Sequence, residues 1–266
     1  MKKHPRDPLI VAHRGSSALA PENTLAAFRR AIADGAEGIE FDVRLAKDDV
    51  VVFHDPTLTR VGGVTGQVAK LTAGELGRTD VGSWFNERFP RLADPSFAKE
   101  TVPTLRRTLE LLSDFRGLIY VELKARESEV VRLTEAVAEI LRDSPLKPQV
   151  IVKSFQLDAI PLFKKLRSDV RTAALFAPKI MTILRKEKRL VAVAGDLGAD
   201  MISIHYSLAT RKLVEKAEKR GLPVTIWTAD NPRWVKRSSE LGLFAVITND
   251  PAALLKRRQA GSDRPR

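Results

Sequence analysis

The sequence contains no cysteine and no long hydrophobic run. Without cysteine, disulfide bonds, thiolate metal sites and cysteine nucleophiles are excluded, so any metal must be held by oxygen or imidazole. No stretch approaches the roughly 18 apolar residues of a membrane span. The apolar run Leu9–Ala12 is also shorter than the roughly 7–15 residues of a signal-peptide core. We therefore expect a soluble, cytoplasmic protein with no stable membrane insertion.

Acidic residues are in the minority, with 33 Asp and Glu against 45 Lys and Arg, so the net charge is +12. A basic surface can attract nucleic acid, anionic lipid or a phosphorylated substrate. No arginine–aromatic platform or recognisable nucleic-acid module accompanies the charge, so we expect no nucleic-acid partner. The basic end of the chain, residues 257–266, is expected to be a disordered tail.

The length and the hydrophobic pattern favour one large barrel. A chain of 266 residues suits a (β/α)8 TIM barrel. Eight short apolar runs occur, at Leu9–His13, Gly38–Val43, Gly117–Lys124, Gln149–Phe155, Arg171–Phe176, Met201–Tyr206, Pro223–Thr228 and Ala245–Thr248. Helical patterns are seen at Thr24–Asp34, Thr104–Asp114, Ser128–Leu141, Asp158–Leu166, Thr210–Arg220, Pro232–Glu240 and Pro251–Gln259. Strict alternation implies parallel strands with right-handed crossovers. We therefore predict an α/β fold, a single TIM-barrel domain spanning residues 1–266.

A ninth run, Val50–His54, interrupts this alternation. It follows Gly38–Val43 after a short polar link, and a parallel return needs a crossover of a dozen or more residues. The two runs are therefore predicted to form an antiparallel hairpin that brings His54 to the same end of the barrel as Glu40 and Asp42. Residues 56–103 then form a stretch too long for a simple loop, which we interpret as a small insertion subdomain after the hairpin.

Carboxylates alternate with apolar residues on the second and third predicted strands. Glu40 and Asp42 share one face, because side chains at i and i+2 of a strand point the same way. Two inward carboxylates are costly unless a cation neutralises them, and a buried ion pair with Arg44 or Lys124 is the structural alternative. Glu122 repeats the pattern on the third strand. Three such acids would form an oxygen cage suited to Mg²⁺ or Ca²⁺.

Two histidines are expected at the mouth of the barrel. His13 ends the first strand and His54 ends the hairpin. A lone histidine is more often structural, but two at separate strand ends near predicted metal ligands favour catalysis, with one base and one acid for attack at phosphorus. Arg14 can bind two phosphate oxygens and Lys124 adds a further positive charge. Gly15 permits a tight turn after the strand.

Eight short motifs occur in register with these strands. They are H-R-G at 13–15, P-E-N-T at 21–24, E-F-D at 40–42, V-F-H-D at 52–55, E-L-K at 122–124, S-F at 154–155, I-W-T at 226–228 and I-T-N-D-P at 247–251. Together they resemble the glycerophosphodiester phosphodiesterase family, from His13 to Pro251. One departure is Asn249, which stands where the family commonly has an acid, so no catalytic role is assigned to it.

The resemblance implies a TIM barrel that holds one divalent cation, Mg²⁺ or Ca²⁺. It implies metal ligands at Glu40, Asp42 and Glu122, and acid–base catalysis by His13 and His54. Substrate-binding residues are implied at the phosphate-contacting Arg14 and Lys124, at Trp227 in the glycerol pocket, and more weakly at Ser154 and Phe155 in the pocket wall.

The resemblance also implies a small-molecule substrate and a place in lipid and glycerol metabolism. The expected reaction hydrolyses sn-glycero-3-phospho-X to glycerol 3-phosphate and an alcohol. The resemblance suggests that the 2-hydroxyl attacks first to give a cyclic phosphate, and direct attack by water is the alternative. One alternative is a lysophospholipase D that uses the same site and contacts lipid through Trp84, Phe85 and Phe89. Another is a non-catalytic barrel that binds phosphodiesters. The head group and the oligomeric state are left open.

Overall fold

The computed structural model describes residues 7–179 and 187–262, and it contains a closed barrel of eight parallel strands. Each strand pairs with the next barrel strand along the chain. The first strand, β1, pairs with both β2 and the last strand, β9, which closes the ring. The predicted fold is therefore confirmed. The strands are β1 (Leu9–His13), β2 (Gly38–Leu45), β4 (Leu118–Leu123), β5 (Val150–Ser154), β6 (Arg171–Phe176), β7 (Met201–His205), β8 (Val224–Trp227) and β9 (Ala245–Thr248).

The remaining strand, β3 (Val50–Val52), runs antiparallel to the end of β2. Val43 pairs with Val52 and Leu45 pairs with Val50, so β2 extends past the barrel wall and the chain turns back along it. This confirms the predicted hairpin. The turn places residue 54 beside the carboxyl ends of the barrel strands, where active sites of this architecture are built.

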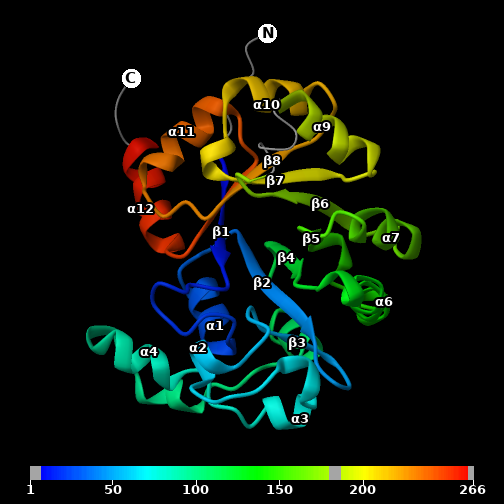
Figure 1. Ribbon diagram of the computed structural model, residues 1–266. Helices are drawn as coiled ribbons and strands as arrows, with labels where there is room; N and C mark the ends of the chain where they lie inside the picture. Colours follow the sequence, from blue (N-terminus) through cyan, green and yellow to red (C-terminus); the bar gives the residue numbers. More distant parts are fainter. Residues whose placement is uncertain (1–6, 180–186, 263–266) are drawn as a thin grey trace.

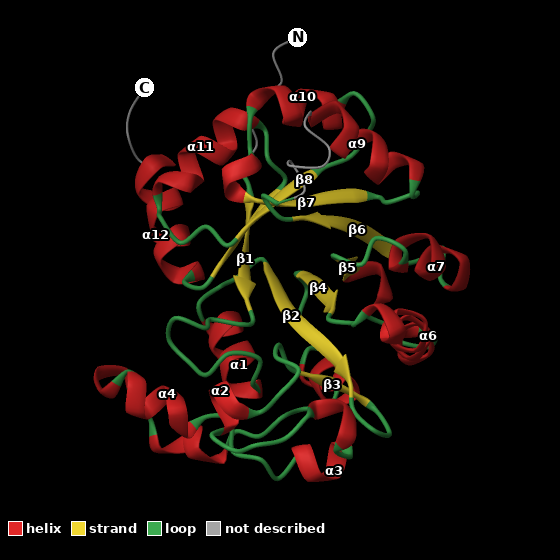
Figure 2. Ribbon diagram, viewed as in Figure 1, coloured by secondary structure: helices red, strands yellow, loops and turns green. Residues whose placement is uncertain are grey.

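Helices surround the barrel on the outside (Figures 1 and 2). Among the helices that the structure describes, none is both long and apolar enough to span a bilayer. One helix, α9, lies in a segment where no helix was predicted. The outer helices are α1 (Leu25–Ala33), α5 (Leu105–Leu111), α6 (Val130–Leu141), α7 (Ala159–Leu166), α9 (Glu187–Asp196), α10 (Arg211–Glu218), α11 (Arg233–Leu241) and α12 (Pro251–Ser262).

Helix α12 corrects one expectation about the end of the chain. It continues through Ser262, so residues 257–262 are helical and not part of a disordered tail, and residues 263–266 lie outside the described residues. Arg258 gives the physical reason. Its guanidinium donates to both carboxylate oxygens of Glu37, at 2.7 and 3.0 Å, and to the Pro8 carbonyl at 3.1 Å. The helix is thereby tied to the start of β1.

The insertion at 56–103 is built from short helices at one side of the barrel, at the bottom of the view in Figure 1. Phe85 is fully buried there and packs edge-on against Phe97, so it cannot contact lipid as the lysophospholipase alternative supposed. Phe89 is 38% exposed. The helices are α2 (Thr59–Gly62), η1 (Val68–Lys70), α3 (Ala73–Leu76), α4 (Ser83–Arg88), η2 (Pro90–Leu92) and η3 (Pro95–Lys99).

The turn after β1 depends on Gly15. Its backbone has a φ of 79°, in the left-handed region that side chains with a Cβ disfavour. A Cβ built on Gly15 would also lie 2.6 Å from the backbone carbonyl carbon and oxygen of Ala27 in α1. The absence of a side chain at position 15 therefore allows α1 to pack directly against the turn.

We expect Gly15→Ala to destabilise the protein by at least about 2 kcal/mol more than Gly63→Ala, because the added methyl group must displace backbone atoms of α1. Gly63 is the matched control, since it has a φ of 62° but no atom within 4 Å of the position that a Cβ would take. That variant should lose only the backbone contribution of roughly 1 kcal/mol. Urea denaturation of both variants measures the difference, and equal losses would contradict the packing argument.

Candidate active site

Three carboxylates lie inside the mouth of the barrel, as the alternation on β2 and β4 predicted. Glu40, Asp42 and Glu122 are all buried, and one oxygen from each lies within 4.8 Å of the others. Asp42 and Glu122 are direct neighbours in the β2–β4 register, while Glu40 lies one inward position earlier on β2. We call these three residues the acid cluster.

The acid cluster has the donor set of a cation site. Each acid has one buried oxygen at ion-pair distance from a lysine: Lys153 Nζ is 2.8 Å from Glu40 Oε1, Lys124 Nζ is 3.3 Å from Asp42 Oδ1, and Lys124 Nζ also pairs with Glu122 Oε1. Two ammonium groups are thus shared among three carboxylates. Converging carboxylates of this kind suit a hard divalent cation.

Lys124 contacts the acid cluster and Arg44 does not. Lys124 Nζ pairs with Asp42 and, more closely, with Glu122. Arg44 instead donates to two backbone carbonyls, that of His54 at 2.6 Å and that of Lys124 at 3.0 Å. Of the two ion pairs considered from the sequence, only the one with Lys124 is present. Arg44 acts by holding the end of the hairpin against the end of β4.

A second lysine, which the sequence analysis did not identify, completes the charge balance. Lys153 on β5 is buried and its Nζ lies 2.8 Å from Glu40 Oε1 and 3.3 Å from Glu122 Oε2. The signal was present in the sequence, because Lys153 shares the inward face of β5 with Ile151, two positions earlier. Ile151 belongs to the side chains that fill the barrel interior.

Arg14 links the β1–α1 loop to the acid cluster. Its backbone N–H donates to Glu40 Oε2 at 3.1 Å, and its guanidinium lies 3.0 Å from Asp42 Oδ2 and 2.7 Å from Glu22 Oε1. Arg14 adopts a φ of 55°, which is unusual for a residue with a side chain. With this backbone conformation, the main chain of Arg14 reaches Glu40 while its side chain reaches Asp42 and Glu22. Arg60 of the insertion holds the other side of Glu22, at 2.7 and 2.8 Å.

Asn23 is also part of this arrangement, while Thr24 is the residue that caps α1. The Thr24 hydroxyl accepts from the Ala27 N–H. Asn23, with a φ of 57°, donates from Nδ2 to Asp42 Oδ2 at 3.0 Å and accepts from the Asp42 N–H at 3.2 Å. Burial acts to raise the pKa of Asp42, but Lys124 and Arg14 outweigh it and hold that pKa well below its ordinary value.

His13 is oriented by Asn249, the residue that departs from the family pattern. Asn249 donates through its amide to Asp230 at 2.8 Å, which leaves its carbonyl oxygen as the acceptor for His13 Nδ1 at 2.7 Å and for the Ser17 hydroxyl at 2.9 Å. His13 Nδ1 therefore carries a proton. Nε2 is the free ring nitrogen, and it lies 3.9 Å from Glu40 Oε2. No spacing rule connects Asn249 and Asp230 to position 13, so the sequence alone did not reveal this chain.

His54 is oriented by a carboxylate. Its Nδ1 lies 2.6 Å from Asp55 Oδ1, and Arg60 Nε lies 2.5 Å from the other oxygen of Asp55. The aspartate fixes the Nδ1–H tautomer and leaves Nε2 free, as in histidines that transfer protons. Because Arg60 also binds Glu22, a continuous chain of charged groups joins His54 to Arg14.

The pKa of His54 is lowered from its ordinary value. Burial is the largest cause, and the nearby positive charges of Arg14 and Lys124 act in the same direction, while Asp42 and Asp55 oppose them. The neutral imidazole is therefore favoured near neutral pH. A neutral ring with a free Nε2 is the form that can accept a proton.

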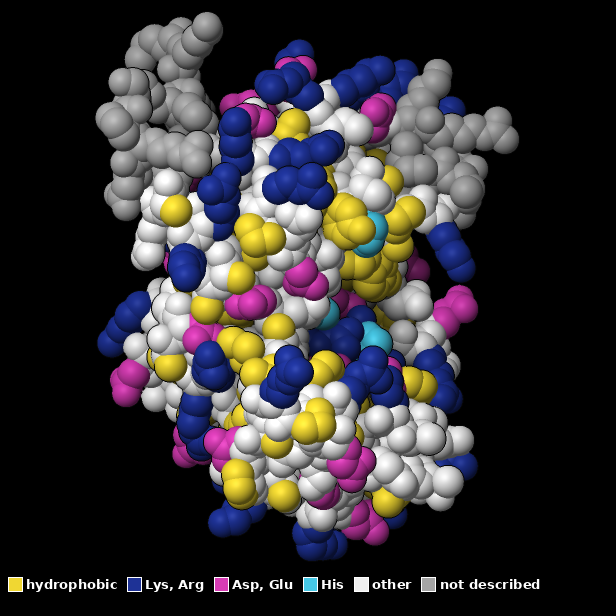
Figure 3. All heavy atoms as spheres, turned by 90° about the vertical axis from the view of Figure 1, so that its left-hand side faces the viewer, with side chains coloured by type: hydrophobic (Ala, Val, Ile, Leu, Met, Phe, Trp, Pro, Cys, Tyr) yellow, Lys and Arg dark blue, Asp and Glu magenta, His cyan; other side chains and the backbone are white. Residues whose placement is uncertain are grey.

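An aromatic row borders the charged half of the mouth. Phe155 and Trp227 meet edge-on at 5.4 Å, Trp227 meets His205 at 5.4 Å, and His205 stacks on Tyr206 at 4.3 Å. Phe155 and Tyr206 are 40% and 37% exposed. On the face shown in Figure 3, histidine and basic side chains lie together near the middle, and hydrophobic side chains gather beside them. Trp234, 5.5 Å from Tyr206, ends the row.

Two predicted substrate-binding residues differ in what the structure allows. Lys124 Nζ lies 5.6 Å from the centre of the Phe155 ring, so Phe155 borders the charged groups. Ser154 is fully buried, and its hydroxyl donates to the Leu123 carbonyl at 3.4 Å and accepts from the Gln156 N–H at 3.0 Å. Its role in the pocket wall stays a prediction, with a hydroxyl already engaged in shaping the end of β5.

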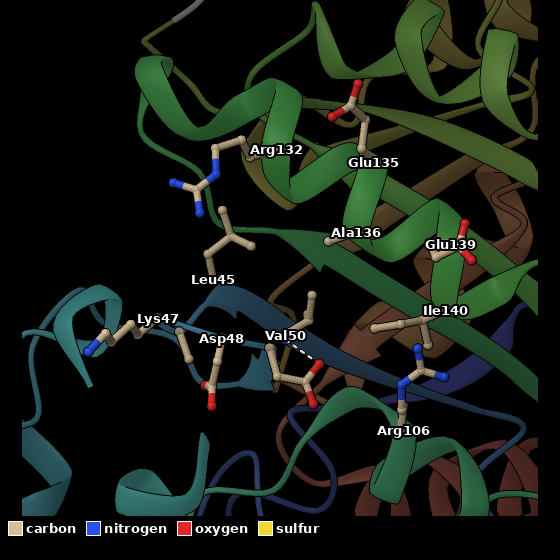
Figure 4. A pocket seen from close by; sticks show the side chains of 12 residues that line it. Leu45, Lys47, Asp48, Val50, Arg106, Arg132, Glu135, Ala136, Glu139 and Ile140 are labelled. Atoms are coloured by element: carbon tan, nitrogen blue, oxygen red, sulfur yellow. Dashed lines mark hydrogen bonds between the residues drawn. The ribbon is translucent and has the colours of Figure 1, made fainter. Parts of the chain in front are cut away.

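A separate cavity of about 540 Å³ lies between the hairpin tip and α6 (Figure 4). Three of its four acids are engaged locally: Asp49 Oδ1 accepts from the Val50 N–H at 2.7 Å, Asp48 Oδ1 accepts from the Ala73 N–H at 2.7 Å, and Glu139 pairs with Arg142. Its basic side chains, Lys47, Arg106 and Arg132, come from three different elements and do not converge in Figure 4. None of the site residues described above lines it. This cavity therefore lacks the convergence of charged groups seen at the acid cluster.

Comparison with known proteins gives matches over nearly the whole chain. The model of the glycerophosphoryl diester phosphodiesterase family matches residues 13–253. The glycerophosphodiester phosphodiesterase of Caldanaerobacter subterraneus is 32% identical over 250 residues, which cover 93% of this chain and 96% of that protein. An Oleispira antarctica phosphodiesterase, solved in complex with the product sn-glycerol-3-phosphate, is 27% identical with a TM-score of 0.82, covering 95% of this chain and 97% of that one.

A third similar protein is the glycerophosphodiester phosphodiesterase of Agrobacterium tumefaciens, which is 26% identical. Its structure superimposes with a TM-score of 0.76 and covers 94% of this chain and 99% of that one. The similarity thus extends over nearly the whole length of each relative, and the family match includes both histidines and all three members of the acid cluster. The chain belongs to the glycerophosphoryl diester phosphodiesterase family.

Proposed function

We propose that this protein is a metal-dependent phosphodiesterase that hydrolyses glycerophosphodiesters to glycerol 3-phosphate and an alcohol. The observation that carries the proposal is the convergence of three buried carboxylates, two histidines with free Nε2 atoms and two basic side chains at one mouth. The names of the similar proteins support the activity, and the sn-glycerol-3-phosphate bound to the Oleispira antarctica enzyme supports the product.

Glu40, Asp42 and Glu122 are the residues that would hold the cation, which we propose to be Mg²⁺ or Ca²⁺. Such an ion supplies positive charge at a phosphate oxygen and lowers the pKa of a coordinated hydroxyl. Arg14 and Lys124 would bind the remaining phosphate oxygens. Both side chains lie at the edge of the acid cluster and are partly exposed to the mouth of the barrel. A guanidinium and an ammonium together match a phosphodiester, which carries one negative charge.

The two histidines would share the proton transfers. We assign His54 as the base, because its neutral form is favoured and Asp55 stabilises the ring once it has taken up a proton. His13 is then the acid, which in its doubly protonated form would donate the Nε2 proton to the departing alcohol. Asn249 keeps the ring in place by accepting from the Nδ1–H. The attacking group would be the glycerol 2-hydroxyl, and water would open the resulting cyclic phosphate.

The aromatic row favours a second candidate activity at the same site, that of a lysophospholipase D. Trp227 lies at the end of β8, where it would pack against the glycerol carbons. The row continues from Trp227 through His205 to Tyr206 and Trp234, beyond the length that glycerol alone would cover. An acyl chain attached to the glycerol would bury part of this surface.

The acid cluster yields a first prediction for activity. Glu122→Gln should lower the affinity for Mg²⁺ or Ca²⁺ at least roughly 10-fold and remove most turnover, because an amide oxygen replaces a charged ligand. Glu135→Gln, on the exposed face of α6, is the control and should change neither. Chelation should mimic the variant, and added cation should restore wild-type activity. Glycerol 3-phosphate release and calorimetric titration measure both effects; full activity of chelated enzyme would exclude a metal role.

The histidine assignment yields a second prediction. His54→Ala should reduce kcat at least roughly 10²-fold, the lower range for loss of general acid–base catalysis, while cation affinity stays near that of the wild type. Asp55→Asn should reduce kcat less. Because the lowered pKa of His54 keeps the base neutral, the acidic limb of the wild-type pH profile should appear only below that pKa, and this limb should move to lower pH in Asp55→Asn, because Asp55 acts to raise the pKa of His54. An unchanged rate in His54→Ala would remove the residue from the mechanism.

The aromatic row yields a third prediction, which separates the two candidate substrates. Trp227→Ala should raise KM for glycerophosphocholine and for a lysophospholipid alike, because both present glycerol carbons. Tyr206→Ala should raise KM several-fold for the lysophospholipid only, if the acyl chain lies on the row. Steady-state assays below the micelle concentration give both values. No activity on lysophospholipids, or equal effects of Tyr206→Ala on both substrates, would count against the second activity.

A further inference from the structure

Two lysines contact the acid cluster, and they differ in how far they are withdrawn from solvent. The Lys153 side chain is 2% exposed, whereas that of Lys124 is 16% exposed. Lys153 reaches Glu40 Oε1 and Glu122 Oε2 from within the barrel. Lys124 reaches Asp42 Oδ1 and Glu122 Oε1 from the end of β4 at the mouth. The two ammonium groups therefore bind different oxygens of Glu122.

Lys153 cannot leave the acid cluster without exposing an unpaired charge to the barrel interior. The surrounding side chains of that interior are largely apolar and include Ile151 and Tyr120, and burying an unpaired ammonium there is prohibitively costly. The Lys153 ammonium group is instead held between two buried carboxylates at once, those of Glu40 and Glu122. Lys153 is thus a fixed positive charge beneath the site.

Lys124 and Arg14, by contrast, can exchange their partners. Each lies at the mouth, with a side chain 16% exposed, and each is needed for the phosphate in the proposed function. When a phosphodiester takes up their charge, Lys153 is the only fixed positively charged side chain among the described residues that still pairs with the three carboxylates of the acid cluster. The three carboxylates and the Lys153 ammonium group together then carry a net charge of −2.

We propose that Lys153 is the permanent counter-ion of the acid cluster and limits its residual charge to that of one divalent cation. The idea rests on the proposed function for the identity of the site, but it concerns the charge selectivity of the cation and not the reaction. Lys153 is a positioning residue in this scheme, since it acts on Glu40 and Glu122 and does not touch the substrate. Without it, the same carboxylates would carry three charges and would favour a trivalent ion.

The test compares two ions of similar size and different charge, Ca²⁺ and La³⁺, by calorimetric titration of metal-free protein in the presence of dimethyl phosphate, a phosphodiester that can occupy Arg14 and Lys124 and has no glycerol 2-hydroxyl. Lys153→Met should raise the ratio of La³⁺ to Ca²⁺ affinity at least tenfold over the wild type, because electrostatic attraction grows with the product of the charges. The ratio of the two affinities is compared because a variant that merely displaced the carboxylates would weaken the binding of both ions together. An unchanged or reduced ratio would overturn the proposal.

Two further variants isolate the charge from the shape of the side chain. Lys153→Gln retains a hydrogen-bond donor without the charge, so it should shift the ratio as Lys153→Met does and serves if the methionine variant does not fold. Lys164→Met removes a lysine that pairs with Asp200 at 3.0 Å on the outside of the barrel, and it should leave the ratio unchanged. A shift in that control equal to the shift in Lys153→Met would contradict a local effect. Wild-type turnover of glycerophosphodiesters, measured separately, tests the proposed function, and its failure would leave the ion ratio meaningful.

Discussion

The burial of negative charge at the end of β2 is the constraint to which the rest of the mouth responds. Glu40 and Asp42 point inward because the apolar residues that alternate with them face the helices, and the barrel interior around them is largely apolar. Neighbouring strands supply the compensation: β5 contributes Lys153, and the end of β4 contributes Lys124. The β1–α1 loop adopts left-handed backbone conformations so that Arg14 can reach both acids. Buried ion pairs of this kind contribute little net stability, and an arrangement this costly is understandable as a cation site.

The barrel was predictable because its strands are short, apolar and separated by amphipathic helices. The β2–β3 hairpin followed from chain geometry alone, since the link at 46–49 is too short for a parallel crossover. Helix α9 was missed, although Leu190, Val191 and Ala194 are buried on one face, because the segment is polar overall and follows no strong start signal. The end of α12 was misjudged because composition suggested a solvated tail, whereas Arg258 is anchored through a partner more than two hundred residues away.

The candidate site was predictable where residues alternate along a single strand. Glu40, Asp42 and Glu122 were found by that rule, and the same rule applied to β5 identifies Lys153. The residues that orient the histidines are different in kind. Asp55 follows His54 directly, but Asn249 reaches His13 across the closure of the barrel between β1 and β9. This contact depends on the register in which the first and last strands pair, and the spacing of residues along the sequence does not give that register.

Arg60 gives the insertion a consequence for the whole molecule. It lies in α2, outside the barrel, yet it holds Asp55 behind His54 and Glu22 behind Arg14. Proteins open locally, in cooperative units whose opening free energies are smaller than that of global unfolding. If residues 56–103 open as one such unit, the histidine and the arginine lose their supports together while the barrel remains folded. The fraction of molecules competent for turnover is then limited by the opening equilibrium of residues 56–103. Substitutions in this segment could therefore change how activity depends on temperature without altering any residue that contacts the substrate.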